Sequence, residues 1–293
     1  MKKNLRTALA VTLCLAICVA PALAQSGNNV KTNTRILYHD GPIMAGTTAV
    51  YVIWYGGWNG SAPGNNPATQ SLLVDLITNL GSTPYFSINT AYPDSAGFTP
   101  SGALIYAGSF YDDYSRGSEL NILSIRGIIS DKLASFELLL DPNGIYLVLG
   151  TADISASDTG FCTPKVTPHH GDFVFSGTTV KYAFVGNALR CPSAAAPQFP
   201  GGPTPNNDLA ADAMASTIAA VLSTIVTNPI GNSWFDRYGL ENASKCQGTF
   251  GETYTTANGA RANMRLGQRD WLLQQNWVNH PRKGYCALAA PTQ

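Results

Sequence analysis

The sequence predicts an α/β fold, a single layered domain in which helices cover a mixed or mostly parallel sheet. First, short β-branched and aromatic runs typical of strands alternate along the chain with longer runs of helical spacing. Second, residues 145–149 form an uncharged apolar run of the kind found in the centre of a parallel sheet. Third, residues 208–227 form a long helical run with no charge after Asp212, which predicts a helix buried at the centre of the fold.

The predicted central helix, 208–227, has signals at both ends. Asn206, Asn207 and Asp208 offer side-chain oxygens that can cap its amino end. Asn228-Pro229 ends it, because proline has no amide proton and disfavours helical geometry in the residue before it. The large apolar positions at helical spacing are Met214, Ile218, Val221, Leu222 and Ile225.

The other elements follow from shorter patterns. In chain order we expect a strand over 50–55, a helix over 68–80, strands over 85–91 and 103–111, a helix over 120–139, and strands over 145–149 and 180–185. Gly81 stops the first of these helices, and the turn 141–144 leads directly into the uncharged strand. Residues 239–267 are interpreted as an ordered loop, and 269–278 as a short amphipathic segment.

The amino terminus has the pattern of an export signal over residues 1–24. Basic residues at 2, 3 and 6 precede an apolar run over 8–20 and a small-residue cleavage site at 22–24. A lipid anchor at Cys18 is the alternative. We therefore predict a flexible leader over 25–35, one domain over 36–293, and no further stretch that reaches the ~20 residues of a membrane span. The product is expected outside the cell, in a plant wall or apoplast or in a bacterial periplasm or exterior.

The charge balance of the mature chain disfavours two classes of partner. Three of the 18 basic residues and none of the 18 acidic ones lie in 1–24, which leaves 15 against 18. Because the surface is mildly acidic and no lysine or arginine cluster exists, nucleic acid and anionic membranes are poor candidates. The sequence does not indicate which oligomeric state the protein adopts.

Four cysteines remain after the signal, at 162, 191, 246 and 286, and an even set in an exported chain predicts two disulfides. Three pairings exist. We favour Cys162 with Cys191 and Cys246 with Cys286, which are neighbours in sequence. The sequence has no CxxC spacing, so a zinc site built from these cysteines is disfavoured.

Motifs of the common hydrolases are absent from the sequence. It has no HExxH pair for zinc, no GxSxG turn for a serine nucleophile and no glycine-rich phosphate loop. We therefore expect no cofactor and no metal site.

Six blocks, in order along nearly the whole mature chain, carry a family resemblance. They are ILYHDGPIMAGTTAVYVIWYGGW (36–58), YSRGSEL (114–120), DPNGIYLVLGTADI (141–154), KYAFVGNALRCP (181–192), the helix with its VTNP end (212–229) and the tail 271–286. Together they resemble the exordium-like, phosphate-induced family of plant secreted proteins. That resemblance implies export and a link to growth or nutritional signalling, for a family with no settled catalytic activity.

The resemblance also bears on chemistry. Some members of the family carry a HE-xx-E pattern in the helix that ends in NP, where this chain has Ala220, Val221 and Thr224. The chain is therefore similar to members that lack a metallopeptidase-like triplet, and a zincin-like ancestry of the fold is a hypothesis. Two further cysteines of the family pattern are absent, which supports the pairing of Cys162 with Cys191.

Loop histidines are the catalytic candidates. His39 precedes the first strand, and His170 lies in a predicted loop, where His170-Gly171 matches a histidine-glycine of the family. An acid/base or metal site would require these histidines to converge with a carboxylate such as Asp153 after a strand end. The alternative is that they are exposed or brace loops. Alternating oxygens over 153–158 resemble a calcium loop, but glycine and glutamate are missing where such a loop needs them.

Aromatic residues are the ligand-binding candidates. Trp54, Tyr55 and Trp58 could stack on sugar rings, with Trp58, between small polar residues, expected to be the most exposed. The alternative is that all three belong to the core.

Two functional hypotheses result. The first is a non-catalytic secreted protein that binds a carbohydrate, another wall component or a protein partner. The second is a degenerate zincin-like or other cryptic hydrolase that uses the loop histidines.

Overall fold

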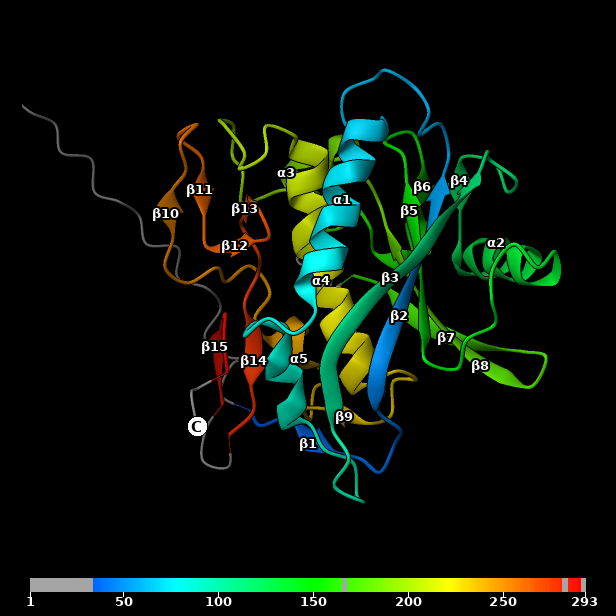
Figure 1. Cartoon of the computed structure of the whole chain (residues 1–293), viewed down its shortest axis with the longest axis vertical. Helices are drawn as coiled ribbons and strands as arrows, with labels where there is room; N and C mark the ends of the chain where they lie inside the picture. Colours follow the sequence, from blue (N-terminus) through cyan, green and yellow to red (C-terminus); the bar gives the residue numbers. More distant parts are fainter. Residues whose placement is uncertain (1–33, 165–167, 281–283, 291–293) are drawn as a thin grey trace, which may run out of the picture.

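A five-stranded sheet forms the centre of the computed structural model, which describes residues 34–164, 168–280 and 284–290 (Figure 1). The predicted signal, 1–24, and the leader up to residue 33 lie outside the described residues. The strand order is β3 (Pro100–Asp112), β2 (Gly46–Tyr55), β5 (Gly144–Gly150), β8 (Thr178–Val185) and β7 (His170–Phe175). The first four strands are parallel, and β7 runs antiparallel to β8. The predicted α/β class with a mostly parallel sheet is confirmed.

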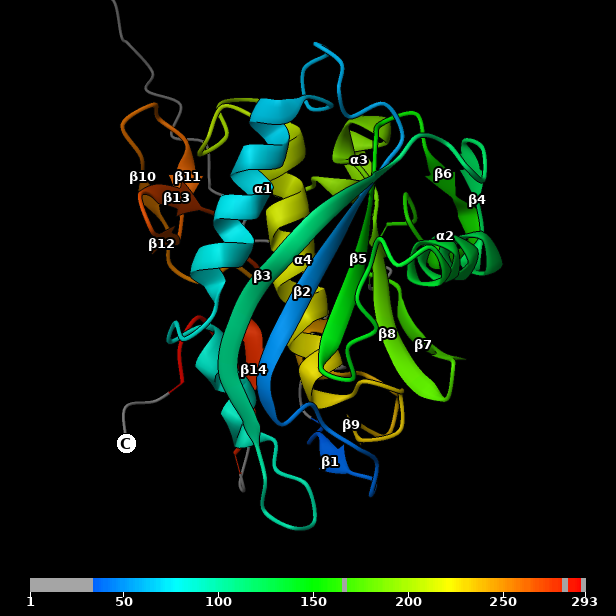
Figure 2. The ribbon, with the colours of Figure 1, turned by 45° about the vertical axis from the view of Figure 1, so that its right-hand side comes forward.

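Helices cover both faces of the sheet (Figure 2). α1 (Pro67–Leu80) and α4 (Leu209–Thr227) share one apolar cluster with Val50, Val52 and Leu147 of the sheet. α2 (Ile122–Ala134) packs on the opposite face, where Ile53 and Val148 point. Alternate strand residues therefore supply two separate cores.

The predicted central helix is confirmed as α4. Asp208 caps it by accepting a hydrogen bond from the amide of Ala211 at 2.9 Å, and Asn228 is its carboxyl cap. By length and composition α4 is also the one described helix that could cross a membrane, with a mean hydropathy of 1.7. Because 89% of that stretch is buried inside the fold, α4 has the surroundings of a core helix.

Two predicted elements need correction, one in its type and the other in its length. Residues 85–91 do not form a strand but a 3₁₀ helix, η1 (Phe86–Ala91), which starts where the Thr83 hydroxyl accepts from the Phe86 amide at 3.1 Å. The helix predicted over 120–139 is shortened to α2. Asn121 caps its start, and Ser135 is its carboxyl cap. Phe136, inside the predicted range, leaves helical geometry with φ 59° and is 90% exposed.

Short hairpins account for two further segments, and the second of them corrects a prediction. The segment 269–278 contains two strands, of which β13 (Arg269–Trp271) pairs with β12 (Met264–Leu266) so that Leu266 and Trp271 both enter the core. His170 and the residues after it lie in strand β7, not in a loop. Its hairpin with β8 turns at Ser176-Gly177, with φ 46° and 80°, a two-residue turn that matches the twist of paired strands.

Short elements complete the described chain. The paired strands are β1 (Leu37–Tyr38) with β9 (Trp234–Phe235), β4 (Glu119–Leu120) with β6 (Ser155–Ala156), β10 (Tyr254–Thr255) with β11 (Arg261–Ala262), and β14 (Asn276–Val278) with β15 (Tyr285–Ala287). The short helices are η2 (Ser157–Thr159), η3 (Ala188–Arg190), α3 (Pro192–Ala195) and α5 (Asn242–Lys245). Residues 239–267, predicted as loop, thus contain one helical turn and three short strands.

Both favoured disulfides form. Cys162 is bonded to Cys191, and Cys246 to Cys286, with sequence separations of 29 and 40 residues. In the chain-entropy model each bond restricts the unfolded chain enough to contribute about 3–4 kcal/mol.

Candidate functional site

The three catalytic candidates lie in three separate places. His39 is exposed after β1 and stacks on Phe235 with ring centroids 3.7 Å apart. Asp153 follows β5, at the carboxyl end of the sheet. His170 opens β7 and faces Glu241. Among the described residues, no hydrogen bond or ion pair joins any two of the three, so they do not form an acid/base site by direct contact.

Asp153 has a structural environment. It accepts hydrogen bonds from the hydroxyls of Tyr114 at 2.8 Å and Thr151 at 2.7 Å. Partial burial opposes its ionisation, but the hydrogen bonds from Thr151 and Tyr114 outweigh burial and lower its pKa. These contacts tie the ends of β3 and β5 together.

Asp158, in the calcium-like run 153–158, also has a structural environment. Both oxygens of Asp158 accept from the amide of Ile122, at 3.1 and 3.0 Å, and so satisfy the start of α2. Among the described residues no group of three or more His, Cys, Asp or Glu side chains is placed to hold a metal ion.

The aromatic candidates are core residues, and the expected exposure of Trp58 is wrong. Trp58 is 0% exposed and donates its indole N–H to the carbonyl of Leu149 at 2.9 Å. Gly56, at φ 96°, turns the chain so that this ring enters the core beside Trp54. Tyr55 is buried on the other face and donates its hydroxyl to Gly117. None of the three presents a face on which a sugar could stack.

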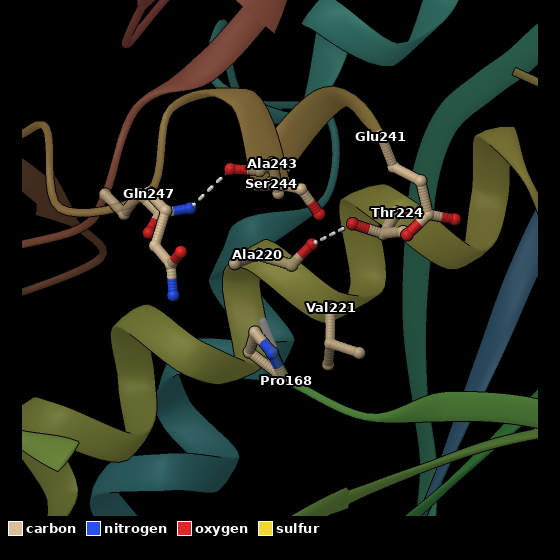
Figure 3. A pocket seen from close by; sticks show the side chains of 9 residues that line it. Pro168, Ala220, Val221, Thr224, Glu241, Ala243, Ser244 and Gln247 are labelled. Atoms are coloured by element: carbon tan, nitrogen blue, oxygen red, sulfur yellow. Dashed lines mark hydrogen bonds between the residues drawn. The ribbon is translucent and has the colours of Figure 1, made fainter. Parts of the chain in front are cut away.

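A small pocket lies over α4 at the positions matched to the metallopeptidase-like triplet (Figure 3). Ala220, Val221 and Thr224 line it from the helix, and Glu241 faces them from the segment before α5. The Thr224 hydroxyl donates back to the Ala220 carbonyl at 3.1 Å. The cavity volume is ≈ 10 Å³, which is room for about one water molecule.

Glu241 joins three segments at the rim of this pocket. One of its oxygens accepts from Asn228, the cap of α4, at 2.6 Å. Its two oxygens lie 3.1 and 3.2 Å from Nε2 of His170. The side chains of His170 and Glu241 are 12% and 14% exposed, so the pair lies at a surface without being fully solvated.

The proton arrangement of His170 limits its chemistry. Because a carboxylate only accepts, Nε2 of His170 carries a proton and donates it to Glu241. Nδ1 is buried and has no hydrogen-bond partner among the residues that the structure describes. Neither ring nitrogen is therefore directed at a ligand in the way a general base requires.

An open hollow adjoins the pair and shares Glu241 and Pro168 with the pocket over α4. Its volume is ≈ 490 Å³. It is lined by Ser157, Asp158, Thr159, Gly160, Pro168, His169, His170 and Glu241. Burial lowers the pKa of His169, which favours the neutral form of this imidazole. Among the described residues, the lining therefore combines two carboxylates with hydroxyls and contains no lysine or arginine, which suits a polar ligand that donates hydrogen bonds or carries positive charge.

Sequence reasoning found His170 but missed Glu241 and Asn228. The three are neighbours only in space, since 71 residues separate His170 from Glu241. The available signal was weak: Asn228 ends the central helix, and Glu241 is an isolated acid in a Gly- and Asn-rich segment.

Comparisons with known proteins give a consistent result. Residues 36–266 match the family model described as phosphate-induced protein 1 conserved region. Protein EXORDIUM-like 5 of Arabidopsis thaliana is 29% identical, over 86% of this chain and 77% of that protein. Protein EXORDIUM-like 3 of the same plant is 30% identical, over 83% and 80%. Protein PHOSPHATE-INDUCED 1 of Nicotiana tabacum is 27% identical, over 84% and 82%. No solved structure matches.

Proposed function

This chain belongs to the EXORDIUM-like, phosphate-induced protein family, and on that premise we propose that it is a secreted, non-catalytic protein that binds an extracellular partner in the hollow beside His170 and Glu241. The signal-like pattern over 1–24 and the two disulfides support secretion. The partner is a wall glycan or a protein, and the family membership supports a role in growth or nutritional signalling.

One observation carries the non-catalytic part of the proposal. At the α4 pocket the helix presents Ala220, Val221 and Thr224, none of which transfers protons or binds a cation strongly. The one carboxylate there, Glu241, is held by Asn228 and His170. The groups that remain can recognise a ligand by hydrogen bonds and charge, but they do not assemble a nucleophile with a base.

The test of binding compares two glutamates. The mature chain from Gln25 is incubated with isolated wall polysaccharide and with immobilised extracellular proteins, alongside Glu241→Gln and the control Glu252→Gln. Glu252 lies in an exposed loop, so its substitution removes the same charge away from the hollow. We expect Glu241→Gln to lose binding and Glu252→Gln to retain it. Equal binding by all three proteins would refute the proposed site.

The alternative is a hydrolase that uses His170, and the His170–Glu241 hydrogen bond is the observation in its favour, since a carboxylate often orients a catalytic imidazole. It predicts time-dependent release of sugars or peptides from the same wall material, abolished by His170→Gln. Binding without release supports the non-catalytic function.

A further inference from the structure

Strand β7 is the outer edge of the central sheet on the side away from β3 (Figures 1 and 2). Among the described residues it pairs with β8 alone, from His170 opposite Ala183 to Phe175 opposite Thr178. An edge strand offers a row of backbone donors and acceptors that another chain can complete.

The register fixes which residues of β7 offer those groups. The amide of Phe184 donates to the carbonyl of His169, so hydrogen-bonded pairs alternate from that pair to the turn at Ser176. The backbone N–H and C=O of His170, Asp172 and Val174 consequently point away from the sheet. Val174, in the half of this edge that is farther from the hollow, is 69% exposed.

The edge begins inside the acidic hollow. His170, the first residue of β7, lines the hollow together with Asp158 and Glu241. A chain added along β7 would place one of its side chains near these carboxylates, because side chains of an added strand alternate between the two faces. A lysine or arginine there would be complementary in charge to the lining.

We propose that β7 receives an extended peptide of a protein partner as a sixth strand, with a basic side chain of that peptide in the hollow beside Glu241 and Asp158. This inference rests on the proposed function and selects a protein over a glycan as its ligand. The burial of Trp54 and Trp58 supports that choice, since these were the side chains expected to stack on sugars. Backbone pairing supplies affinity in this mode, and the hollow supplies selectivity.

The test uses a synthetic library of acetylated heptapeptides whose central residue is fixed as lysine, arginine, serine or glutamate. Binding to the full mature chain is measured by fluorescence anisotropy. We expect enrichment of the lysine and arginine sets over the glutamate set, and loss of about tenfold or more in affinity when alternate amides of a selected peptide are N-methylated. Equal binding of all four sets, or no effect of N-methylation, would overturn the inference.

Two variants at one position locate the contact. Val174→Pro removes an amide that points away from β8, so the ladder inside the sheet is kept. Val174→Ala keeps that amide and is the matched control. We expect the selected peptide to bind Val174→Pro about tenfold more weakly and Val174→Ala about as well as the unchanged chain. The thermal midpoint checks that Val174→Pro folds, and the N-methylated peptides test the pairing without any change to the protein.

The outcomes separate this inference from the proposed function. If the chain binds wall polysaccharide in a Glu241-dependent manner but binds no peptide set, the edge-strand inference fails and the proposed function remains. If Glu241→Gln changes no binding at all, the proposed function fails as well.

Discussion

Asp236 and Glu241 are five residues apart in the sequence, and each pairs with a basic side chain, but their surroundings differ completely. Asp236 lies 2.9 Å from Nζ of Lys245, and both side chains are 0% exposed. Glu241 lies 3.1 Å from Nε2 of His170, and both of those side chains reach the surface of the hollow. The comparison shows that one short segment supplies a structural pair and a candidate binding pair.

The buried pair is fully enclosed. Asp236 also accepts hydrogen bonds from Thr34 and from the amides of Tyr238 and Leu240, and Lys245 lies 4.6 Å from the ring centre of Trp277. These contacts join the start of the described chain to its carboxyl-terminal strands. Because the side chains of Asp236 and Lys245 are 0% exposed, we expect Asp236 to affect stability, whereas the side chain of Glu241 is 14% exposed and lines the hollow.

The largest expected effect is that of Asp236→Ala. This change leaves the Lys245 ammonium buried without its carboxylate, and we expect the free energy of unfolding to fall by about 3–5 kcal/mol. Urea unfolding measures it, with Asp113→Ala, at an exposed carboxylate, as the control. A loss below about 1 kcal/mol, the range of surface ion pairs, would remove the distinction between the two carboxylates.

Loss of a disulfide should have the next largest effect on stability. One disulfide lies next to the buried pair and the other next to the hollow. Cys246–Cys286 closes a longer loop beside the buried pair, and Cys162–Cys191 is attached to the segment next to the hollow. Replacing either pair by serines should cost about 3–4 kcal/mol. We expect ligand binding to survive loss of Cys246–Cys286 and to weaken on loss of Cys162–Cys191. Binding assays below each variant's unfolding midpoint check this difference, and the reverse result would contradict the placement of the site.

The sequence predicts the two cores better than the site. The helix α4 and the strands around 50–55, 103–111, 145–149 and 180–185 were found because long apolar periodicity reflects burial directly. β7 was missed because His170, Gly171 and Asp172 interrupt any alternation, and only its pairing with β8 makes it a strand. Trp58 was misplaced because its small polar neighbours suggest a loop, whereas the turn at Gly56 directs the ring inward.

Glu241 shows why the site was harder than the fold. Its role depends on His170 from β7 and Asn228 from the end of α4, and no local pattern links these segments. Asp236 would have been an equal candidate from the sequence, since both are isolated acids near a base. Only burial, which the fold decides, separates them.

Acid should weaken the buried pair selectively. Burial opposes the ionisation of Asp236, but the hydrogen bonds from Thr34 and Lys245 outweigh it and hold its pKa below the usual value. A lowered folded-state pKa contributes stability that is present above the unfolded-state value of about 3.9 and is lost as pH falls through the folded-state value. The stability difference between the unchanged chain and Asp236→Ala should therefore shrink below about pH 4. Urea midpoints from neutral to acid pH measure it, and a constant difference would contradict this assignment.

The smallest expected effect on stability is that of Glu241→Gln. Glutamine keeps an oxygen that can accept from Asn228 or His170, and the site is partly solvated, so we expect a loss of about 1 kcal/mol or less. The same change removes one of the two carboxylates of the hollow and should abolish selection of lysine-centred over glutamate-centred peptides. A variant that is stable but unselective is what distinguishes Glu241 from Asp236, whose loss should lower stability without altering selectivity in the molecules that remain folded. If Glu241→Gln instead unfolds the chain as readily as Asp236→Ala does, both carboxylates are structural and the hollow has no binding role.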